Sequence, residues 1–194
     1  KGREVIVPES GQGALGPAIL SMRSIYADNR NHPEFYRRMS AYLEAALGYE
    51  IQFAQPRLWN TKGETVQAYL DERGSEDDLL KTVSCWQKRR NVNVGGKRRQ
   101  CGVCAACMLR RQSLHAADLE EPAETYSWGD LNRASLLAAR PEALHGETTS
   151  SMHHYAVAGI QHLVGLSRLG REKAQSSELR SKSLQIAKSL DAPH

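Results

Sequence analysis

The chain has 194 residues, of which 40% are hydrophobic, and this is enough to build one sizeable domain or a domain with an appendage. No apolar run approaches the roughly 18 residues of a membrane span, and no ordered charged, apolar and small-residue stretch marks a secretory signal, so we expect a cytoplasmic protein that has no membrane partner. The formal net charge of +4 is unevenly distributed, because residues 85–111 alone carry +8 and leave −4 for the remainder.

The first part of the chain alternates between strand-like and helix-like segments. Arg3–Pro8 is a short apolar run that suits a buried strand, and Tyr49–Phe53 alternates as a second strand. Between them, a helix is predicted over Pro33–Leu47, with an apolar face made of Phe35, Met39, Tyr42, Leu43 and Ala46. A capping box at Thr61–Glu64 opens another helix that ends near Gly74. The order strand, helix, strand, helix predicts an α/β fold.

A glycine-rich segment follows the first predicted strand. Gly11–Gly16 matches the G-x-G-x-x-G pattern of dinucleotide-binding loops. However, Pro8–Ser10 separates it from the strand, Pro17 follows directly, and no strand with a terminal acid follows about 20 residues later. We therefore interpret the segment as a loop that turns at the end of a strand, which is where α/β sheets bind ligands.

All four cysteines of the chain lie in one stretch, with the pattern Cys85-x15-Cys101-x2-Cys104-x2-Cys107. Thiolates three residues apart in a tight turn can converge on one ion, and a fourth from upstream completes the tetrahedron that structural zinc prefers. Four engaged thiolates leave no open position for a substrate, so we predict a structural Zn²⁺ site in the loop of residues 85–107. An iron–sulfur cluster, which also uses four cysteines, is the alternative that stays open.

Positive charge is concentrated around the cysteines. Between Cys85 and Arg111 there is no Asp or Glu, and the basic residues there are Lys88, Arg89, Arg90, Lys97, Arg98, Arg99, Arg110 and Arg111. Such a patch attracts the phosphates of a nucleotide, a nucleic acid or an acidic partner. The alternative is a solvated loop that lysine and arginine merely keep soluble.

The last third of the chain is expected to be helical. The predicted helices, with Pro122 and Pro141 as stop signals, are Met108–Leu119, Leu131–Ala139, Ser151–Leu169 and Ser176–Leu190. We therefore divide the chain into a domain of residues 1–122 and a helical appendage of residues 123–194. The adjacent His153 and His154 face different sides of the third helix, so we assign them to no site.

Residues 4–115 resemble the C-terminal half of the 7-cyano-7-deazaguanine synthase family, the QueC-like proteins. The motifs that carry the resemblance are VPESGQGALGPAI, Asn31-His32-Pro33, Thr61-Lys62-Gly63-Glu64, Ser84-Cys85 and CGVCAACMLRR. The strand-end loop with PES, the helix start with HP and the CxxCxxCxxRR ending look most like the divergent branch of the family found in bacterial antiphage defence operons.

The resemblance implies the C-terminal portion of a Rossmann-like PP-loop domain of the adenine nucleotide alpha hydrolase-like fold. Such enzymes use ATP with Mg²⁺ to adenylate a carboxylate, here that of 7-carboxy-7-deazaguanine or a related compound, and ammonia then displaces AMP to form an amide or a nitrile. By the same match, Lys62 contacts phosphate or substrate and Arg110 and Arg111 contribute. The match also implies that Cys85, Cys101, Cys104 and Cys107 are zinc ligands that fix a loop beside the substrate pocket.

Two features depart from the family. Its ATP-binding loop, an S-G-G-x-D-S segment after the first strand, is absent from this sequence. We therefore expect a missing N-terminal half or a partner subunit to carry the ATP-binding part, and the chain alone not to hydrolyse ATP. The fifteen residues between Cys85 and Cys101 also form a longer, more basic insertion than expected. The substrate classes therefore include a deazaguanine-type small molecule, a nucleic acid and a modified protein.

A function of another class is a zinc-stapled basic module that binds nucleic acid without catalysis. Such binding to phosphates would weaken steeply with salt. Trp86 is the only aromatic residue of the basic stretch, which makes it a poor platform for stacking single strands. A homodimer, or another partner docked on the apolar faces of the C-terminal helices, is compatible with either function.

Overall fold

The structure, a computed structural model, describes residues 3–20, 28–87, 93–142, 150–169, 171 and 176–189. The chain forms two compact units: a first unit of Lys1–Lys62 with Leu163–His194, and a second unit of Gly63–His162. The predicted boundary near Pro122 falls inside the second unit, and a division at residue 122 stays a prediction. Within the described ranges, no helix combines the length and the apolar character that crossing a membrane requires.

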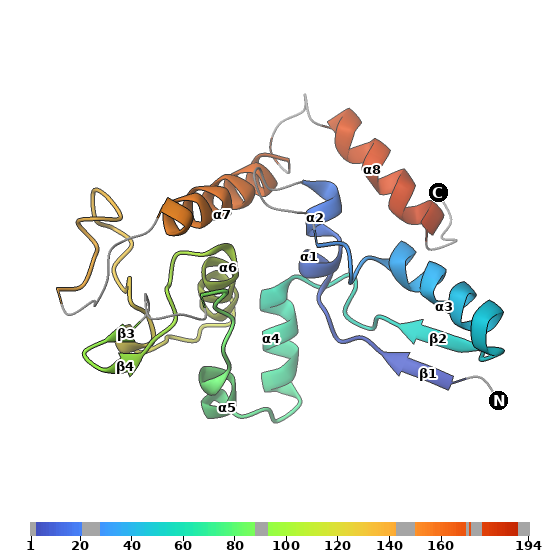
Figure 1. The fold of residues 1–194 in the computed structure, drawn as a ribbon, viewed down its shortest axis with the longest axis horizontal. Helices are drawn as coiled ribbons and strands as arrows, with labels where there is room; N and C mark the ends of the chain where they lie inside the picture. The colour runs from blue at the N-terminus through green and yellow to red at the C-terminus, as the bar shows by residue number, and fades with distance from the viewer. Residues whose placement is uncertain are drawn as a thin grey trace. The chain divides into compact units, whose positions relative to one another are not determined.

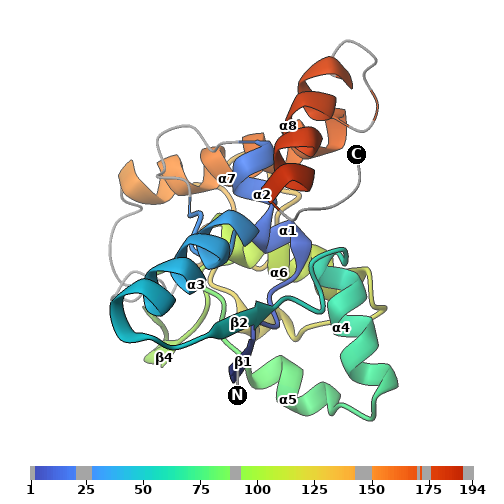
Figure 2. The same ribbon diagram turned by 90° about the vertical axis from the view of Figure 1, so that its right-hand side faces the viewer.

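The first unit is built on a parallel pair of strands, as the α/β pattern predicts. β1 (Arg3–Ile6) pairs with β2 (Ile51–Ala54), with Arg3 opposite Ile51. The connection between them contains α1 (Gly11–Ala14), α2 (Gly16–Ile19) and α3 (Pro33–Leu47) (Figure 1). Because the strands are parallel, their carboxyl ends lie at the same edge of the sheet, and the chain continues from β1 into α1 at this edge (Figure 2).

The prediction that the first strand is buried is wrong. All four residues of β1 are exposed, and Ile6 is 65% exposed. Among the described residues, β2 is the only strand that pairs with β1, so the sheet has two strands and no third strand on the other side of β1. Parallel strands are normally covered on both faces, and β1 lacks such a cover here.

The ends of α3 follow the sequence signals. His32 is the N-cap residue and its Nδ1 accepts a hydrogen bond from the Glu34 N–H, while Pro33 occupies the first turn. At the other end Gly48 adopts a left-handed conformation with a φ of 65°, and its N–H donates to the Glu44 carbonyl. The predicted bounds of this helix are confirmed.

The apolar face predicted for α3 is only partly correct. Phe35 and Tyr42 are exposed, at 38% and 65%. Instead, the Tyr36 ring stacks on Phe53 of β2 with a centroid distance of 4.8 Å. The Tyr36 hydroxyl donates to Asn31 Oδ1, and this bond satisfies the polar end of a tyrosine whose ring packs against the sheet.

A small apolar cluster holds the remaining helices of the first unit. It is formed by Ala14, Leu15, Leu58 and Ile186, with Ile19 packed against it. Ile186 lies on α8 (Ser176–Ser189), whose predicted extent is confirmed except for Leu190, which lies outside the described residues. Lys182 of the same helix donates from its Nζ to the Ile19 carbonyl at 2.6 Å.

The second unit is made of short elements around the cysteine stretch. In chain order they are α4 (Lys62–Asp71, from Gly63 on), α5 (Glu76–Lys81), β3 (Asn93–Val94), β4 (Lys97–Arg98), α6 (Ala105–His115), the 3₁₀ turn η2 (Ala123–Thr125) and the part of α7 (Ser150–Leu169) that ends at His162. The helix predicted over Met108–Leu119 begins and ends a few residues earlier, as α6. The helix predicted over Ser151–Leu169 is confirmed as α7.

The helix predicted over Leu131–Ala139 is wrong, because this segment forms bends and turns. A single helix-like hydrogen bond joins the Ala139 N–H to the Ser135 carbonyl. The buried Trp128 indole donates its Nε1–H to the Leu136 carbonyl at 3.0 Å. The indole thus occupies the Leu136 carbonyl, which would accept a backbone hydrogen bond if the segment were a helix. This bond holds the segment as a turn over the indole.

The cap of α3 predicts a pH dependence of stability. Burial lowers the pKa of His32 below its ordinary value of 6.5. The folded protein therefore favours the neutral imidazole ring of His32. The free energy of unfolding that this neutral ring contributes is fully present above about pH 6.5, and it is lost as the pH falls through the lowered pKa. We expect His32→Ala to cost about 1 kcal/mol near neutral pH, and the difference from the unmodified protein to shrink below about pH 6.

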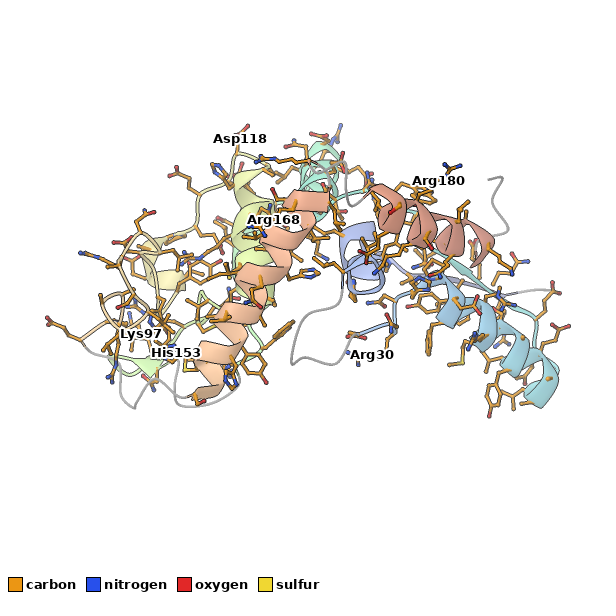
Figure 3. The ribbon with its side chains drawn as sticks, turned by 90° about the horizontal axis from the view of Figure 1, so that it is seen from above. Arg30, Lys97, Asp118, His153, Arg168 and Arg180 are labelled. Carbon is orange, nitrogen blue, oxygen red and sulfur yellow. The ribbon has the colours of Figure 1, made fainter. Side chains whose placement is uncertain are left out.

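Urea unfolding of both proteins between about pH 5 and pH 8 measures this difference. His153→Ala, on the exposed side of α7 (Figure 3), is the control and should show no such convergence. A constant gap between His32→Ala and the unmodified protein at every pH would contradict the proposed role of the neutral imidazole.

Candidate metal centre and strand-end lysine

The four cysteines predicted to bind zinc converge on one point. Their Sγ atoms all lie within 4.8 Å of one another, and Cys101 Sγ and Cys107 Sγ are 3.8 Å apart. None of the four forms a disulfide. Sulfur ligands at the corners of a zinc tetrahedron lie about 3.8 Å apart, given zinc–sulfur bonds of about 2.3 Å. The cluster therefore fits a metal ion such as zinc.

The cysteines come from segments that the chain folds together. Cys85 follows α5, Cys101 follows β4, Cys104 is the N-cap of α6 and Cys107 lies in the first turn of this helix. The turn between Cys101 and Cys104 needs Gly102, which has a φ of 87°. A Cβ atom at Gly102 would lie 2.6 Å from the Trp128 carbonyl oxygen, so this position has no room for a side chain.

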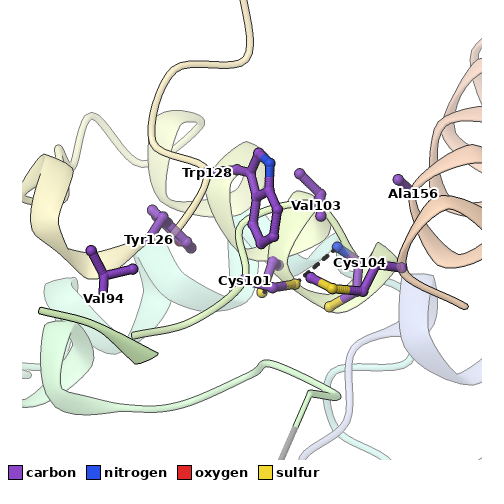
Figure 4. Packing of buried hydrophobic residues seen from close by; sticks show 9 residues of the cluster. Val94, Cys101, Val103, Cys104, Tyr126, Trp128 and Ala156 are labelled. Atoms are coloured by element: carbon purple, nitrogen blue, oxygen red, sulfur yellow. Dashed lines mark hydrogen bonds between the residues drawn. The ribbon is translucent and has the colours of Figure 1, made fainter. Parts of the chain in front are cut away.

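Backbone N–H groups surround the sulfur atoms. Cys85 Sγ accepts hydrogen bonds from the N–H groups of Cys101 at 3.2 Å and Gln87 at 3.3 Å. Cys101 Sγ accepts one from the Cys104 N–H at 3.3 Å (Figure 4). Two of the cysteines also lie at the N-terminus of α6, where the helix dipole is positive. These groups favour thiolates, which are the form that binds a metal.

The thiols also influence one another. Hydrogen bonds with Cys101 lower the pKa of Cys85 below its ordinary value and bring the pKa of Cys104 to about 7. The hydrogen bond with Cys101 raises the pKa of Cys107. The four neighbouring thiols therefore differ in how readily they lose their protons. Because a divalent cation must displace these protons when it binds, its affinity should rise with pH.

Apolar side chains enclose the sulfur cluster. Trp128 and Cys104 are fully buried, and Tyr126, Val103 and Ala156 pack in the same cluster (Figure 4). Sequence reasoning assigned no role to Tyr126 and Trp128. The signal available was a pair of aromatic residues in the YSW segment after Pro122, and only the fold shows that this segment returns to the cysteines. Two hydrogen bonds hold the segment beside the cysteines: the Ser127 N–H donates to the Gln100 carbonyl, and the Trp128 N–H donates to the Cys101 carbonyl.

Arg111 holds this segment in place. Its guanidinium lies 3.9 Å from the centre of the Tyr126 ring, and its Nη2 and Nη1 donate to the carbonyls of Trp128 and Gly129 at 2.7 and 3.0 Å. The predicted contact of Arg111 with phosphate is not supported by these bonds. The side chain instead ties α6 to the segment that covers the cysteines.

Arg110 forms a buried ion pair. It is 8% exposed, and its Nε lies 2.8 Å from Glu121 Oε1. Its Nη1 donates to Thr82 Oγ1 and its Nη2 to the Leu79 carbonyl, while Glu121 also accepts a hydrogen bond from the Tyr126 hydroxyl. Each guanidinium nitrogen thus has a protein partner, and the predicted phosphate contact of Arg110 is not supported either. Glu121 was missed because one acid among several carries no sequence signal.

Lys62 lies at the carboxyl ends of the two strands. Its Nζ is 2.7 Å from Glu9 Oε1, and its backbone N–H donates to Gln12 Oε1 at 3.1 Å. Glu9 Oε1 also accepts from the Ser10 N–H at 3.0 Å. The side chains of Lys62 and Glu9 are 37% and 27% exposed, so the pair remains open to solvent. We call Glu9, Ser10, Gln12 and Lys62 the strand-end site.

The glycine-rich segment builds the strand-end site by close packing. The Gly11 N–H donates to the carbonyls of both Arg57 and Asn60 at 3.0 Å. A Cβ atom at Gly11 would lie 1.8 Å from the Leu58 carbonyl oxygen, so only glycine fits. The interpretation of Gly11–Gly16 as a loop is wrong, because α1 and α2 form here. Gly11 allows the start of α1 to pack closely against the turn after β2.

The basic patch is only partly described. Lys97 and Arg98 are exposed on the hairpin of β3 and β4, where Gly95 and Gly96 form the turn (Figure 3). Arg99 is half-buried. The other members, Lys88, Arg89 and Arg90, lie outside the described residues. With Arg110 and Arg111 engaged in the scaffold, the described and exposed part of the patch is the hairpin.

A comparison with models of protein families matches residues 18–118 to QueC, described as queuosine biosynthesis protein QueC. The match covers more than half of the 194 residues. It includes α3, β2, Lys62 and all four cysteines. No solved structure matches the chain.

The metal centre predicts a coupled loss of metal and structure. Replacing one sulfur ligand by Cys104→Ser should remove the bound metal and unfold the second unit, because metal binding supplies on the order of 10 kcal/mol to such sites. Metal content by plasma mass spectrometry and unfolding followed by circular dichroism measure both effects. Arg133→Ala, in an exposed turn of the same unit, is the control. A Cys104→Ser protein that keeps one metal per chain would contradict the assignment.

Proposed function

Because the chain belongs to the QueC family, we propose that it is part of an ATP-dependent ligase that adenylates the carboxylate of 7-carboxy-7-deazaguanine or a related compound and forms an amide or a nitrile. The family consists of ligase-type enzymes with a PP-loop, Rossmann-like fold and a 7-cyano-7-deazaguanine synthase-like role. The observation that carries the proposal is that the matched segment contains both the four-cysteine cluster and Lys62.

Zinc is the metal that we propose for the cysteine cluster. Four thiolates, a sulfur spacing that suits a tetrahedron and a sheath of buried aromatic side chains are typical of a closed structural site. Zinc there would supply folding free energy to a stretch that has few apolar residues of its own. No position would remain for a substrate, so the reaction must be supported elsewhere in the protein.

The strand-end site is our candidate for binding the reacting groups. In the activation step, a carboxylate oxygen attacks the α-phosphorus of ATP, the bond from this phosphorus to the α,β-bridging oxygen breaks, and pyrophosphate leaves. A fixed cation stabilises the negative charge that develops on the leaving oxygen. Lys62 offers an ammonium group that Glu9 holds in place at 2.7 Å while leaving it open to solvent. We propose that Lys62 binds the substrate carboxylate or the departing phosphate, and that Glu9 positions Lys62.

We propose that the ATP-binding part lies outside these 194 residues. The sequence contains no S-G-G-x-D-S segment, and we propose that an N-terminal half or a partner subunit brings this segment with ATP and Mg²⁺. The exposed β1 supports this arrangement, because a further parallel strand beside it would cover its open edge and a helix layer would cover Val5 and Ile6. A homodimer is a second arrangement that would cover exposed apolar residues.

We further propose that the protein belongs to the antiphage-defence branch and acts in the cytoplasm. The PES loop at the strand end and the basic insertion between Cys85 and Cys101 support this proposal. An insertion of this charge favours an anionic macromolecule, such as a nucleic acid or an acidic protein segment, as a carrier of the reacting group.

Nucleic-acid binding without catalysis is the alternative function. The observation that favours it is the hairpin of β3 and β4, which presents Lys97 and Arg98 to solvent on a tight Gly95–Gly96 turn. Trp86 is a weak stacking platform, because it is 43% exposed and already makes an edge contact with Tyr155.

The enzymatic proposal predicts a specific loss on changing Lys62. Together with the polypeptide that carries the S-G-G-x-D-S segment, the chain should release pyrophosphate from ATP when 7-carboxy-7-deazaguanine is added. Lys62→Ala should lower this rate about 10- to 100-fold, because a charge-assisted hydrogen bond of about 1.5–3 kcal/mol is lost. Lys81→Ala, an exposed lysine on α5, is the control and should keep the rate. No pyrophosphate release under any of these conditions would refute the proposal.

The alternative predicts a salt dependence. Affinity for an RNA or DNA oligonucleotide, measured by fluorescence anisotropy, should fall linearly on logarithmic axes with salt. Changing both Lys97 and Arg98 to alanine should reduce the slope by about 2, because two phosphate contacts disappear. Arg30→Ala, an exposed arginine of the first unit (Figure 3), is the control. Binding that does not respond to salt or to the hairpin changes would exclude this function.

A further inference from the structure

Trp59 has an unusual position for a tryptophan. It is 75% exposed and is the most exposed large apolar side chain among the described residues, whereas Trp128 is fully buried. Exposing an indole ring to water leaves a large apolar surface without its usual partners. It lies in the turn after β2, three residues before Lys62, on the edge of the sheet where the strand-end site is formed.

The turn that carries Trp59 is rigid. The Leu58 N–H donates to the Gln55 carbonyl at 3.1 Å, and the Asn60 N–H donates to the Arg57 carbonyl at 3.0 Å. Leu58 is 5% exposed and anchors the turn in the apolar cluster of the first unit. The chain on both sides of Trp59 is thus fixed while the indole itself projects into solvent.

Neighbouring segments brace the same turn from two sides. The Gly11 N–H joins the carbonyls of Arg57 and Asn60, the residues two before and one after Trp59. Gln55 Nε2 donates to the Asn31 carbonyl at 2.8 Å. A large aromatic side chain on a backbone held this firmly loses little conformational entropy when a flat ligand binds it.

The structure assigns to Trp59 the role of a stacking platform: we propose that it binds the flat heterocyclic ring of the ligand whose carboxylate or phosphate is bound by Lys62. This inference rests on the proposed function, and it adds the part of the site that recognises the ring. Every nucleobase-like ring has a π-face that stacks on an indole, so Trp59 would supply affinity and Lys62 would select the charged substituent. Neither group alone would distinguish an acid of this ring system from other acids or other bases.

The experiment uses two ligands with the same ring. One is 7-carboxy-7-deazaguanine, and the other is 7-deazaguanine, which lacks the carboxylate. Binding to the full 194-residue chain is followed by calorimetry and by quenching of tryptophan fluorescence. Trp59→Ala should lower the affinity for both ligands by about 5- to 100-fold and abolish most of the fluorescence quenching. Trp59→Phe should keep part of the affinity, because a smaller aromatic face remains.

Lys62→Ala separates the two contributions. This change should lower the affinity for 7-carboxy-7-deazaguanine and leave the affinity for 7-deazaguanine within about twofold of the unmodified chain, because only the acid carries the charge. Tyr42→Ala is the matched control, since Tyr42 is a 65% exposed aromatic side chain on α3. Metal content and circular dichroism of each variant verify that it folds, and the exposure of Trp59 predicts that its removal leaves both unchanged.

The outcomes distinguish the two proposals. If the acid binds with a dependence on Lys62 but Trp59→Ala binds as well as the unmodified chain, the stacking platform is wrong and the proposed function stands. If 7-deazaguanine binds with a dependence on Trp59 while the carboxylate adds nothing, the platform stands and the proposed carboxylate chemistry is wrong. If neither ligand binds, or if Trp59→Ala weakens only the association with the ATP-binding polypeptide, the platform is refuted.

Discussion

The convergence of four sulfur atoms within 4.8 Å is the constraint on which the second unit depends. Three of the four cysteines are members of its only large apolar cluster among the described residues, so the candidate metal centre lies within the core. Four thiols there share protons poorly, whereas a divalent cation would neutralise thiolates and hold four chain segments at one point. Elements as short as β3 and β4 could not be fixed by their own hydrogen bonds.

The arginines beside the cysteines show how a charge motif can serve a scaffold. Arg111 lies over Tyr126 and binds two carbonyls of the covering segment, and Arg110 pairs with the buried Glu121. An arginine can do this because its planar fork offers several donors and its face stacks on an aromatic ring. Breaking the buried pair would leave a charge without compensation. Within the part of the basic patch that the structure describes, the positive charge left for an external partner therefore lies on the hairpin.

The strand-end site follows a different logic, in which backbone packing places a few polar groups. Gly11 approaches the Leu58 carbonyl so closely that no side chain fits, and this contact brings the loop after β1 against the loop after β2. Glu9 and Lys62 then meet although they are far apart in the sequence. One loop thus contributes an acid, and the other contributes a lysine and an exposed indole, which together suit a flat, negatively charged ligand.

The sequence by itself determined the α/β order, the ends of α3, the grouping of the four cysteines and the family, because caps, periodicity and cysteine spacing are local signals. It misassigned the segment Leu131–Ala139, it did not reveal the scaffold bonds of Arg110 and Arg111, and it did not reveal the roles of Glu121, Tyr126 or Trp128. Only the tertiary structure decided these roles, since each depends on a partner brought from a distant segment. The sequence shows the same arginine whether its guanidinium binds an external phosphate or a buried carboxylate. Only the fold shows whether the side chain is buried and which partner it has.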